Sequence, residues 1–291
     1  MNEPASNAPD LTRRTIIVTG ASDGIGAAAA RSLTSHGHEV VIVGRSPDKT
    51  RAVAAETGAE FHIADFARLD EVRDLARELD QRHERIDVLA NNAGGIFGER
   101  KKTVDGFELT FQVNHLAPFL LTSLLLPKLI AGRASIIQTS SIGARFSGKI
   151  DIDDLDMDRN YSAIRAYMAS KLENVLFTRE LHRRYHAEGI SAAAFHPGNI
   201  ASGFGAHTQS RLMRLIATNP IFRAVAATPE QGAQQLVWLA EGMPGRDWES
   251  GAYYERGKPA SRENPQAREA RLAEQLWERS AQLVGMANKQ P

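Results

Sequence analysis

Short runs of β-branched residues alternate with longer amphipathic segments, and this alternation restricts the fold more than any other feature of the sequence. Each run is nearly continuous in apolar residues, whereas the segments that follow carry helical periodicity. Buried strands separated by helices are typical of βαβ units, in which neighbouring strands lie parallel. The expected strands are 15–19, 39–43, 60–64, 86–90, 135–138, 190–195 and 252–255. The expected helices are 24–35, 47–57, 68–83, 103–130, 161–187 and 229–242.

Successive βαβ units with right-handed crossovers produce a doubly wound sheet. We therefore expect an α/β protein with a doubly wound (Rossmann) parallel seven-stranded sheet and helices on both faces. The 291 residues suffice for one large domain or for two small ones. No internal repeat or low-complexity linker divides the chain, so a single domain is the simplest interpretation.

Some segments lie outside the alternation. Residues 1–10 are polar and contain two prolines, and we interpret them as a disordered leader. The domain is expected to span 11–258, and residues 200–225 within it, rich in Ser, Gly and long apolar side chains, to form a substrate lid. A helical tail is expected at 259–291. Its amphipathic helix, 265–285, is predicted to pack on the domain, with a contact to a partner or to the substrate mouth as the alternative.

The composition excludes several kinds of site. There is no cysteine, which rules out disulfides, thiolate zinc sites, iron–sulfur clusters and a cysteine nucleophile. The 35 basic residues balance 35 acidic ones, which argues against a nucleic-acid partner. No secretion signal is recognisable, and no stretch approaches the roughly 18 apolar residues of a membrane span. We expect a cytoplasmic protein without a membrane span.

A glycine-rich turn lies between the first expected strand and the first helix. Its spacing is Gly-x-x-x-Gly-x-Gly rather than the more common Gly-x-Gly-x-x-Gly, and no Gly-Lys-Ser/Thr follows it. Glycine lets the backbone approach a ligand closely, and the start of a helix favours a pyrophosphate. The turn therefore predicts a dinucleotide site, although an ordinary tight turn is the alternative. Its predicted cofactor-binding residues are Gly20, Ser22, Asp23, Gly24, Ile25 and Gly26.

Arg45 follows the second strand, where this architecture places the adenosine ribose. An acidic residue there would accept from a ribose 2′-hydroxyl, whereas an arginine suits a 2′-phosphate. Arg45 therefore favours NADP over NAD, with an exposed loop arginine as the alternative. Asp23 weakens this prediction, because its carboxylate would repel the phosphates.

Two further strand ends are predicted to contact the cofactor. Asp65 and Phe66 follow the third strand and are expected to touch the adenine. The fourth strand ends in a turn of small residues, Asn92, Ala93 and Gly94, which can run close beside the ribose. An ordinary strand-ending turn is the alternative.

Tyr167 and Lys171 are four residues apart in an expected helix, so their side chains share one face. A cation beside a phenol lowers the pKa of the phenol, which would make Tyr167 a proton donor and acceptor near neutral pH. The spacing alone is common. Together with the glycine turn and Ser141 after the fifth strand, it predicts carbonyl–alcohol chemistry on a nicotinamide cofactor.

These segments together resemble the short-chain dehydrogenase/reductase family. The resemblance covers about residues 13 to 258, and its motifs occur in the correct order. It implies an NAD(P)-binding catalytic domain. The motifs are Thr19-Gly20-Ala21-Ser22-Asp23-Gly24-Ile25-Gly26, Asn91-Asn92-Ala93-Gly94, Asn114, Ser141, Tyr167-x-x-x-Lys171 and Pro197-Gly198.

The resemblance also implies roles for individual residues. Tyr167 would be the general acid in carbonyl reduction and the general base in alcohol oxidation. Lys171 would bind the nicotinamide ribose and hold the pKa of Tyr167 down. Ser141, preferred to Ser140, would polarise the substrate oxygen, and Asn114 would anchor a water between Lys171 and solvent. The residues expected to meet the carboxamide of the cofactor are Pro197, Gly198, Ile200 and Ser202.

Ser141 and Tyr167 are 26 positions apart, about double the usual separation in the family. The inserted segment 148–155 resembles the retinol-dehydrogenase-like branch. That branch often has an N-terminal membrane anchor, which this sequence lacks, so a membrane-bound retinoid role is not expected. Loops 96–102, 143–160 and 200–225 are expected to line the substrate pocket.

The leading hypothesis is an NADP-dependent oxidoreductase that interconverts a carbonyl and an alcohol on an apolar small molecule. One alternative is a catalytically silent NADP-binding sensor or scaffold. The other is a nucleotide-sugar epimerase or dehydratase, which shares Tyr-x-x-x-Lys but needs a larger C-terminal domain. By analogy with the family, the long helix 161–187 could pair in a homodimer.

Two other patterns are given structural interpretations. His182 and His186 share a helix face, but no carboxylate signature completes a metal site, so no metal is expected. The basic run 100–102 is interpreted as a solvated loop.

Overall fold

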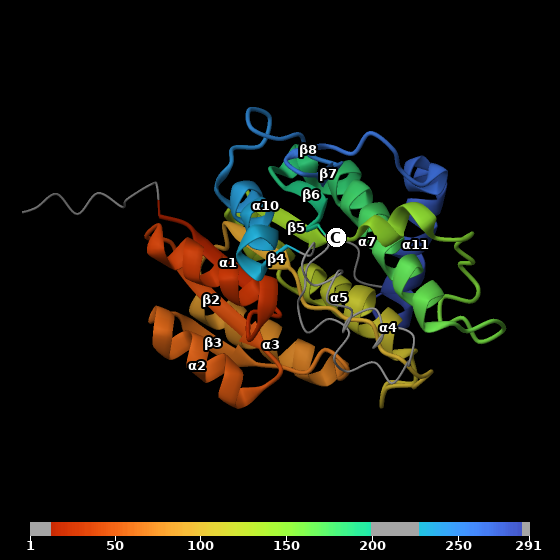
Figure 1. Cartoon of the computed structure of the whole chain (residues 1–291), viewed down its shortest axis with the longest axis horizontal. Helices are drawn as coiled ribbons and strands as arrows, with labels where there is room; N and C mark the ends of the chain where they lie inside the picture. The colour runs from red at the N-terminus through yellow and green to blue at the C-terminus, as the bar shows by residue number, and fades with distance from the viewer. Residues whose placement is uncertain (1–12, 199–226, 287–291) are drawn as a thin grey trace, which may run out of the picture.

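A computed structural model describes residues 13–198 and 227–286, so the predicted leader 1–10 and lid 200–225 lie outside the described residues. The strands form one sheet in the order β3-β2-β1-β4-β5-β6-β7-β8 (Figure 1). The first seven pair in parallel, as predicted, and β8 adds a two-residue antiparallel edge. The strands are β1 Thr15–Thr19, β2 Glu39–Gly44, β3 Glu60–Ile63, β4 Val88–Asn91, β5 Ser135–Thr139, β6 Ser191–His196, β7 Ala252–Glu255 and β8 Lys258–Pro259.

Helices cover both faces of the sheet, which confirms the doubly wound α/β fold. Successive strand residues point to opposite faces, so Ile16 and Ile17 enter different cores. One core lies beneath α1, α2 and α10, and the other beneath α3, α5, α7 and α11 (Figure 1). The main helices are α1 Gly24–Ser35, α2 Pro47–Thr57, α3 Leu69–Arg82, α4 Leu109–Phe111, α5 Ala117–Leu124, α6 Leu126–Ala131, α7 Ala163–Tyr185, α10 Pro229–Glu241 and α11 Ala270–Leu283.

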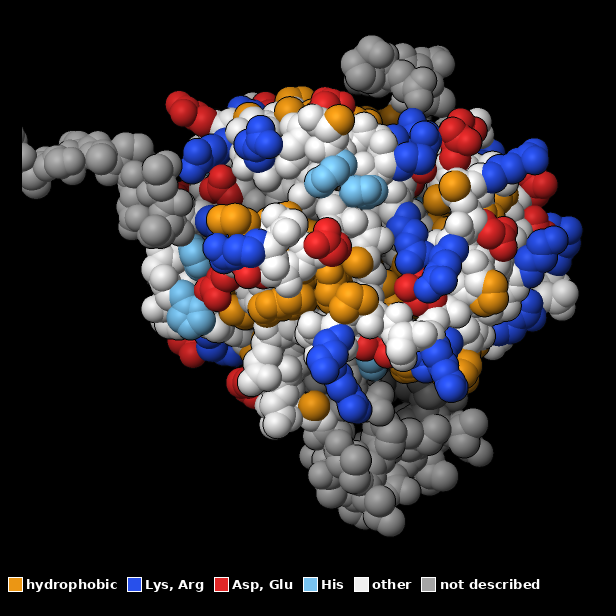
Figure 2. All heavy atoms as spheres, turned by 90° about the horizontal axis from the view of Figure 1, so that it is seen from above, with side chains coloured by type: hydrophobic (Ala, Val, Ile, Leu, Met, Phe, Trp, Pro, Cys, Tyr) orange, Lys and Arg blue, Asp and Glu red, His pale blue; other side chains and the backbone are white. Residues whose placement is uncertain are grey.

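Charges of both signs are mixed over the surface seen in Figure 2. On this face, Lys and Arg side chains lie among Asp and Glu side chains instead of forming a field of one sign. This matches the zero formal net charge of the sequence. In the described ranges 13–198 and 227–286, no helix is both long and apolar enough to cross a bilayer.

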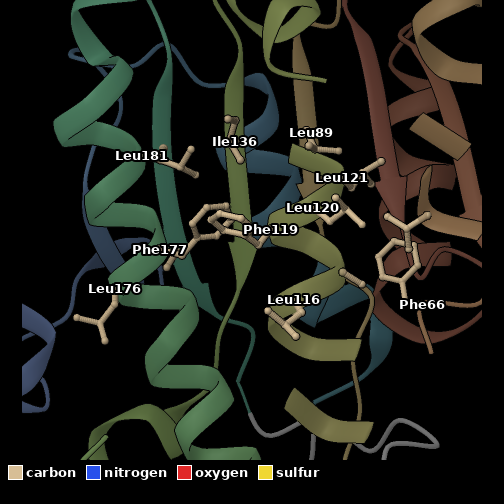
Figure 3. Close-up of a cluster of buried hydrophobic side chains, with 14 of the residues drawn as sticks. Phe66, Leu89, Leu116, Phe119, Leu120, Leu121, Ile136, Leu176, Phe177 and Leu181 are labelled. Atoms are coloured by element: carbon tan, nitrogen blue, oxygen red, sulfur yellow. The ribbon is translucent and has the colours of Figure 1, made fainter. Parts of the chain in front are cut away.

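The larger core lies between the sheet and the α5–α7 layer (Figure 3). Phe119 of α5 packs on Phe177 of α7, with ring centroids 5.4 Å apart. Leu89 and Ile136 contribute from the central strands β4 and β5, and all four side chains are buried. Burial of large apolar side chains from sheet and helices is the main source of stability in such a layer. It holds α7, and therefore Tyr167 and Lys171, against the sheet.

The predicted helix 103–130 is wrong in its first part. Residues 103–108 form a turn that contains Gly106, whose φ is +89°, and is closed by a bridge between Lys102 and Glu108. The helix begins only at Leu109, because the Glu108 carboxylate caps it by accepting from the Phe111 N–H at 2.8 Å. Helical periodicity in the sequence does not reveal that the turn at Gly106 and the Glu108 cap set the start of the helix.

The predicted helix 265–285 is interrupted at Glu269, whose backbone is extended: a short 3-10 helix, Pro265–Arg268, precedes α11. Trp277 of α11 packs edge-on against Phe119 with ring centroids 5.0 Å apart, and the Arg184 guanidinium of α7 lies 4.9 Å from the Trp277 ring. Within the described residues α11 therefore lies against both α5 and α7. The covered part of α7 is not available to a second copy, and a homodimer through α7 stays a prediction.

Candidate active site

The predicted site residues lie at the carboxyl end of the parallel sheet, around β1 and β4. The chain proceeds from β1 to β2 and β3 on one side and from β4 to β7 on the other, so the strand order reverses between β1 and β4. Such a switch point opens a crevice where open α/β sheets bind ligands.

The glycine turn after β1 packs directly on the turn after β4. Gly20 has a φ of +66°, and a Cβ there would lie 2.7 Å from the Cα of Ala93. A Cβ on Gly26 would lie 2.4 Å from the Gly20 carbonyl oxygen. Side chains at these two positions would separate the two turns, so glycine is required for the close approach. The small residues form a backbone-lined cradle that fits a dinucleotide pyrophosphate.

Asp23 caps α1, and its carboxylate accepts from the Gly24 N–H at 2.8 Å. Lys49 of α2 donates to the same carboxylate at 2.6 Å, and this hydrogen bond is the main reason that the pKa of Asp23 is lowered. The lysine offsets the negative charge that was expected to repel phosphates. Ser22 lies beside the end of β2, since a Cβ on Gly44 would lie 2.8 Å from the Ser22 Cβ. Ile25 is half-buried at the start of α1.

Arg45 is exposed directly after β2. Within residues 13–198 and 227–286, no hydrogen bond or ion pair engages its guanidinium. It is therefore free to bind an anion at the position where the sequence predicts the 2′-phosphate.

Asp65 and Phe66 follow β3. The Asp65 carboxylate accepts from the Ala67 N–H at 3.0 Å. The Phe66 side chain is buried in the larger core, as Figure 3 shows, so only the backbone of this residue remains for an adenine contact. The adenine contact stays a prediction.

The turn after β4 is fixed to β1 by side-chain hydrogen bonds. The Thr19 hydroxyl accepts from the N–H groups of Asn92 and Ala93, each at 3.0 Å. The Asn92 amide donates to the Thr19 carbonyl at 3.0 Å. The turn then brings Gly94 to Lys171, since a Cβ on Gly94 would lie 3.3 Å from Lys171 Nζ. The cradle and the Tyr-x-x-x-Lys helix are therefore contiguous.

Ser141, Tyr167 and Lys171 are brought together, as the sequence predicts. The Ser141 hydroxyl hydrogen-bonds the Tyr167 oxygen as donor, and Lys171 Nζ lies 5.6 Å from the centroid of the Tyr167 ring. The Ser141 hydroxyl accepts from the Gly143 N–H at 3.1 Å. The adjacent Ser140 is buried and donates to the Lys171 carbonyl at 2.7 Å. Of the two serines, only Ser141 presents its hydroxyl to the tyrosine.

The predicted low pKa of Tyr167 is not found. Burial raises the pKa of its phenol to about 12, although the hydrogen bond from Ser141 opposes the shift. Burial also lowers the pKa of Lys171 to about 8. A low-dielectric site penalises the charged form of each group, and this effect exceeds that of the neighbouring cation. Tyr167 is therefore a neutral phenol at pH 7, the form that donates a proton.

Asn114 links the cofactor turn to α7. It lies in a π-helical turn, Gln112–Leu116, and is fully buried. Its side-chain oxygen accepts from the Gly95 N–H at 2.9 Å, and its amide donates to the Gly95 carbonyl at 3.0 Å and to Ser170 Oγ at 2.9 Å. Widened turns of this kind are frequent at functional sites. The water expected at Asn114 stays a prediction.

Pro197 and Gly198 follow β6 at the same sheet edge, and Gly198 has a φ of +91°. Their predicted contact with the carboxamide is compatible with this position and stays a prediction. Ile200 and Ser202 lie outside the described residues.

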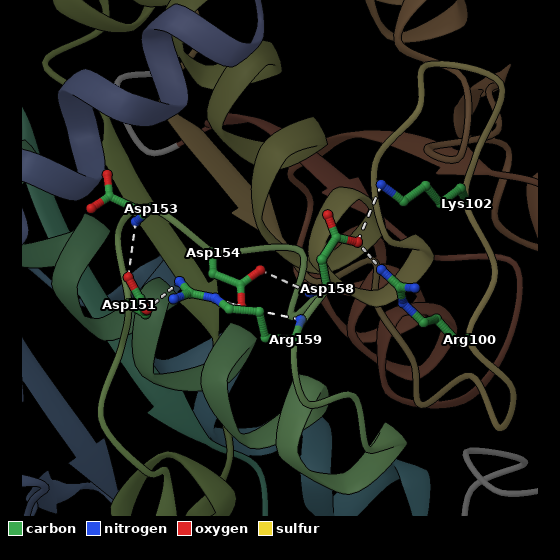
Figure 4. Close-up of polar contacts among 7 residues, drawn as sticks. All are labelled: Arg100, Lys102, Asp151, Asp153, Asp154, Asp158 and Arg159. Carbon is green, nitrogen blue, oxygen red and sulfur yellow. Dashed lines mark hydrogen bonds and ion pairs between the residues drawn. The ribbon is translucent and has the colours of Figure 1, made fainter.

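The segment 148–160, which contains the inserted residues 148–155, is tied to the loop before α4 by ion pairs (Figure 4). Within this segment, Arg159 donates to Asp154 at 3.0 Å and to Asp151 at 2.7 Å. Asp158 pairs with Arg100 and, at 3.3 Å, with Lys102. Residues 100–102 are exposed in a loop, as interpreted, and two of the three cations also pair with Asp158.

Sequence reasoning missed several residues that build the site. Tyr253 of β7 donates to the Ser141 carbonyl at 3.0 Å, a contact between distant strands without a local signal. The main-chain carbonyl of Thr139 accepts from Lys171 Nζ at 3.0 Å, and the Asn174 side-chain amide also donates to it. Asn174 could have been found, because it follows Lys171 by three residues on the same helix face.

A glycine cradle adjoins a Ser–Tyr–Lys cluster, and comparisons of the sequence with known families agree with this arrangement. The sequence profile described as short chain dehydrogenase matches residues 14–212. The chain belongs to this family. It is an NAD(P)-dependent oxidoreductase that acts on CH–OH groups.

Two curated relatives support the retinol-dehydrogenase-like branch. A candidate daunorubicin C-13 ketoreductase, DnrU of Streptomyces sp. (strain C5), is 43% identical over 94% of this chain and 94% of that protein. Human retinol dehydrogenase 13 is 38% identical over 94% of this chain and 85% of that protein.

Solved structures agree with the fold. An uncharacterised Mycobacterium paratuberculosis protein superposes with a TM-score of 0.74 at 31% identity, covering 98% of both chains. A candidate short chain dehydrogenase from Escherichia coli CFT073, complexed with NADPH, has a TM-score of 0.64 at 26% identity. The second match covers 84% of this chain and 97% of that one.

Proposed function

We propose that this protein is an NADP-dependent oxidoreductase that interconverts a carbonyl and an alcohol on an apolar small molecule, with Tyr167 as proton donor and acceptor. The observation that carries the proposal is the hydrogen-bonded pair of Tyr167 and Ser141 beside the buried Lys171. A binding protein without turnover has no need for a phenol, a hydroxyl and a lysine at one crevice.

When bound, NADPH would supply the hydride that the substrate carbon takes up in carbonyl reduction. Tyr167 gives its proton to the substrate oxygen, so that the carbonyl becomes an alcohol and the phenol becomes a phenolate. Ser141 orients and polarises the same oxygen. The ammonium of Lys171 lies near the Tyr167 ring and stabilises the phenolate. Without this cation the buried site disfavours the negative charge. Alcohol oxidation is the reverse.

Two observations support NADP as the preferred cofactor. Arg45 is exposed and, among the described residues, makes no ion pair, whereas the nearby Asp23 is paired with Lys49. A guanidinium at the end of β2 suits a 2′-phosphate. One relative of known structure is described as complexed with NADPH.

An apolar substrate is supported by the residues around the hydroxyl pair. Gly143 is close to both Met168 and Tyr167, since a Cβ on it would lie 3.3 Å from Met168 Cγ and 3.5 Å from Tyr167 Cε1. Phe146, five residues after Ser141, is 65% exposed, and Ile164, one turn before Met168, is 44% exposed. One relative is named for retinol, a largely apolar alcohol.

The test is a screen of NADPH and NADP turnover against apolar ketones, aldehydes and alcohols, with hydrophilic compounds of matched reactivity as controls. We expect turnover of the apolar set and a marked loss with NADH. Tight NADPH binding without turnover of any compound would replace the proposal with the sensor or scaffold alternative.

A further inference from the structure

Asn174 lies outside the residues described so far as catalytic, but it shares an acceptor with the catalytic lysine. Lys171 Nζ donates to the Thr139 carbonyl at 3.0 Å, and Asn174 Nδ2 reaches the same oxygen at 3.4 Å. Asn174 is only 2% exposed. A carbonyl oxygen has two lone pairs, so it can accept from both side chains at once. The position of the Thr139 carbonyl relative to Lys171 therefore depends on Asn174.

The Asn174 side chain also interacts with His115. His115 is 1% exposed, and burial lowers its pKa to about 4, an effect that Asn174 opposes. The imidazole is neutral at working pH, so one ring nitrogen carries a proton and the other a lone pair. Asn174 Oδ1 and His115 Nδ1 are both buried, and among the described residues neither atom has a partner that meets hydrogen-bond geometry. An Nδ1–H on His115 would supply the donor that the amide oxygen lacks, and we therefore infer that the proton lies on Nδ1.

Ser280 completes the arrangement from the C-terminal helix. Its hydroxyl is fully buried and lies 2.9 Å from His115 Nε2. With the proton on Nδ1, Nε2 is an acceptor and the Ser280 hydroxyl donates to it. The His115 ring is held by stacking on Phe111, with centroids 5.7 Å apart, and by an edge contact with Phe177 at 6.0 Å. His115 therefore has one well-defined orientation.

We propose that Asn174 is a positioning residue for Lys171, and that His115 and Ser280 fix the orientation of Asn174. The inference rests on the proposed function of Lys171. It also gives α11 a role in the reaction, because Ser280 connects this helix to the lysine through His115, Asn174 and the Thr139 carbonyl. An ammonium has three donors, and the bond to Thr139 determines where the other two point.

The first experiment replaces the Asn174 amide by an apolar group of similar size, Asn174→Leu. We expect a roughly tenfold slower single-turnover hydride transfer from NADPH, because small displacements of a catalytic group are costly. NADPH affinity should fall about fivefold, because the resemblance places Lys171 on the ribose. The control is Thr178→Val on the same helix, which removes a buried hydroxyl whose one hydrogen bond among the described residues is to the Asn174 backbone carbonyl.

The second experiment tests the remote end with Ser280→Ala and the matched control Ser123→Ala. Both changes remove one helix-borne hydroxyl, but Ser123 donates to the Phe119 carbonyl and has no contact with His115. We expect Ser280→Ala to slow hydride transfer about threefold and Ser123→Ala to leave it unchanged, at similar melting temperatures. If Ser280 had only a structural role, Ser280→Ala would lower the melting temperature, and its hydride-transfer rate would fall no further than that of Ser123→Ala.

The outcomes separate this inference from the proposed function. Wild-type hydride transfer and NADPH affinity in Asn174→Leu would overturn the positioning role, whatever the substrate. If the wild-type protein reduces no carbonyl, the proposed function fails. NADPH affinity then remains the readout for Asn174→Leu, with weakened binding supporting the inference and unchanged binding overturning it.

Discussion

Lys171 Nζ donates to the main-chain carbonyl of Thr139 over 3.0 Å, although this lysine is only 1% exposed. The contact joins α7 to the end of β5, the strand that leads into Ser141. A cationic side chain is thus held at the sheet edge next to Gly94 and the Tyr167 ring.

Tyr167→Phe should reduce turnover by roughly 10²–10⁴-fold, because it removes the only phenolic proton at the Ser141 hydroxyl. NADPH affinity should stay near the wild-type value, since the ring is retained. Steady-state rates and NADPH fluorescence titration measure the two effects. Tyr185→Phe, the same change at the far end of α7, is the control and should retain activity. Undiminished turnover in Tyr167→Phe would reject the mechanism.

Arg45→Glu should lower the NADP-over-NAD preference by roughly tenfold or more, because a carboxylate repels a 2′-phosphate and accepts from a 2′-hydroxyl. The ratio of kcat/KM for NADPH and NADH is the measurement. Arg51→Glu makes the same charge change on the exposed side of α2 and serves as the control. An equal change of the ratio in both variants would show that net charge, and not Arg45, selects the cofactor.

Lys171→Met should abolish turnover and yet stabilise the fold at neutral pH. Burial lowers the pKa of Lys171 to about 8 from an ordinary 10.5. Between these values the unfolded chain binds more protons than the folded one, so wild-type stability rises with pH through this window. The advantage of Lys171→Met should therefore be about 2 kcal/mol larger at pH 7.5 than at pH 9.5. Urea unfolding at both pH values measures it, and a pH-independent difference contradicts the prediction.

Glu173→Gln should act in the opposite pH direction. Burial, with Glu108 and Asp156 nearby, raises the pKa of Glu173 to about 8 from an ordinary 4.5. The folded chain then binds more protons than the unfolded chain between these values, so this group stabilises below pH 4.5 and its contribution is lost as pH rises through 8. Glu173→Gln should gain about 1–3 kcal/mol over wild type between pH 5 and pH 8. Thermal unfolding across this range would show no such trend if the carboxyl were already ionised.

The fold could be predicted from the sequence because strand and helix periodicities persist over whole elements. The true start of α4 could not, because the turn at Gly106 and the Glu108 cap decide it locally. The partners Tyr167 and Lys171 were visible as a spacing. Their pKa directions were not, because burial depends on the complete core around α7. Contacts such as Tyr253 with Ser141 bring together residues that no sequence pattern relates.

Asp158→Asn should raise the KM for the carbonyl substrate severalfold while leaving NADPH affinity unchanged. Asp158 joins the segment 148–160 to the loop before α4 through Arg100 and Lys102, and these two segments are predicted to form part of the substrate pocket. Both ion pairs are half-exposed, so the loss of stability should stay below about 1 kcal/mol. Asp153→Asn in the same segment is the control, because only its backbone N–H bonds within the network in Figure 4. High salt should raise the wild-type KM toward that of Asp158→Asn, since screening weakens exposed ion pairs. Equal KM values for both variants and wild type would show that the ion pairs do not shape the pocket.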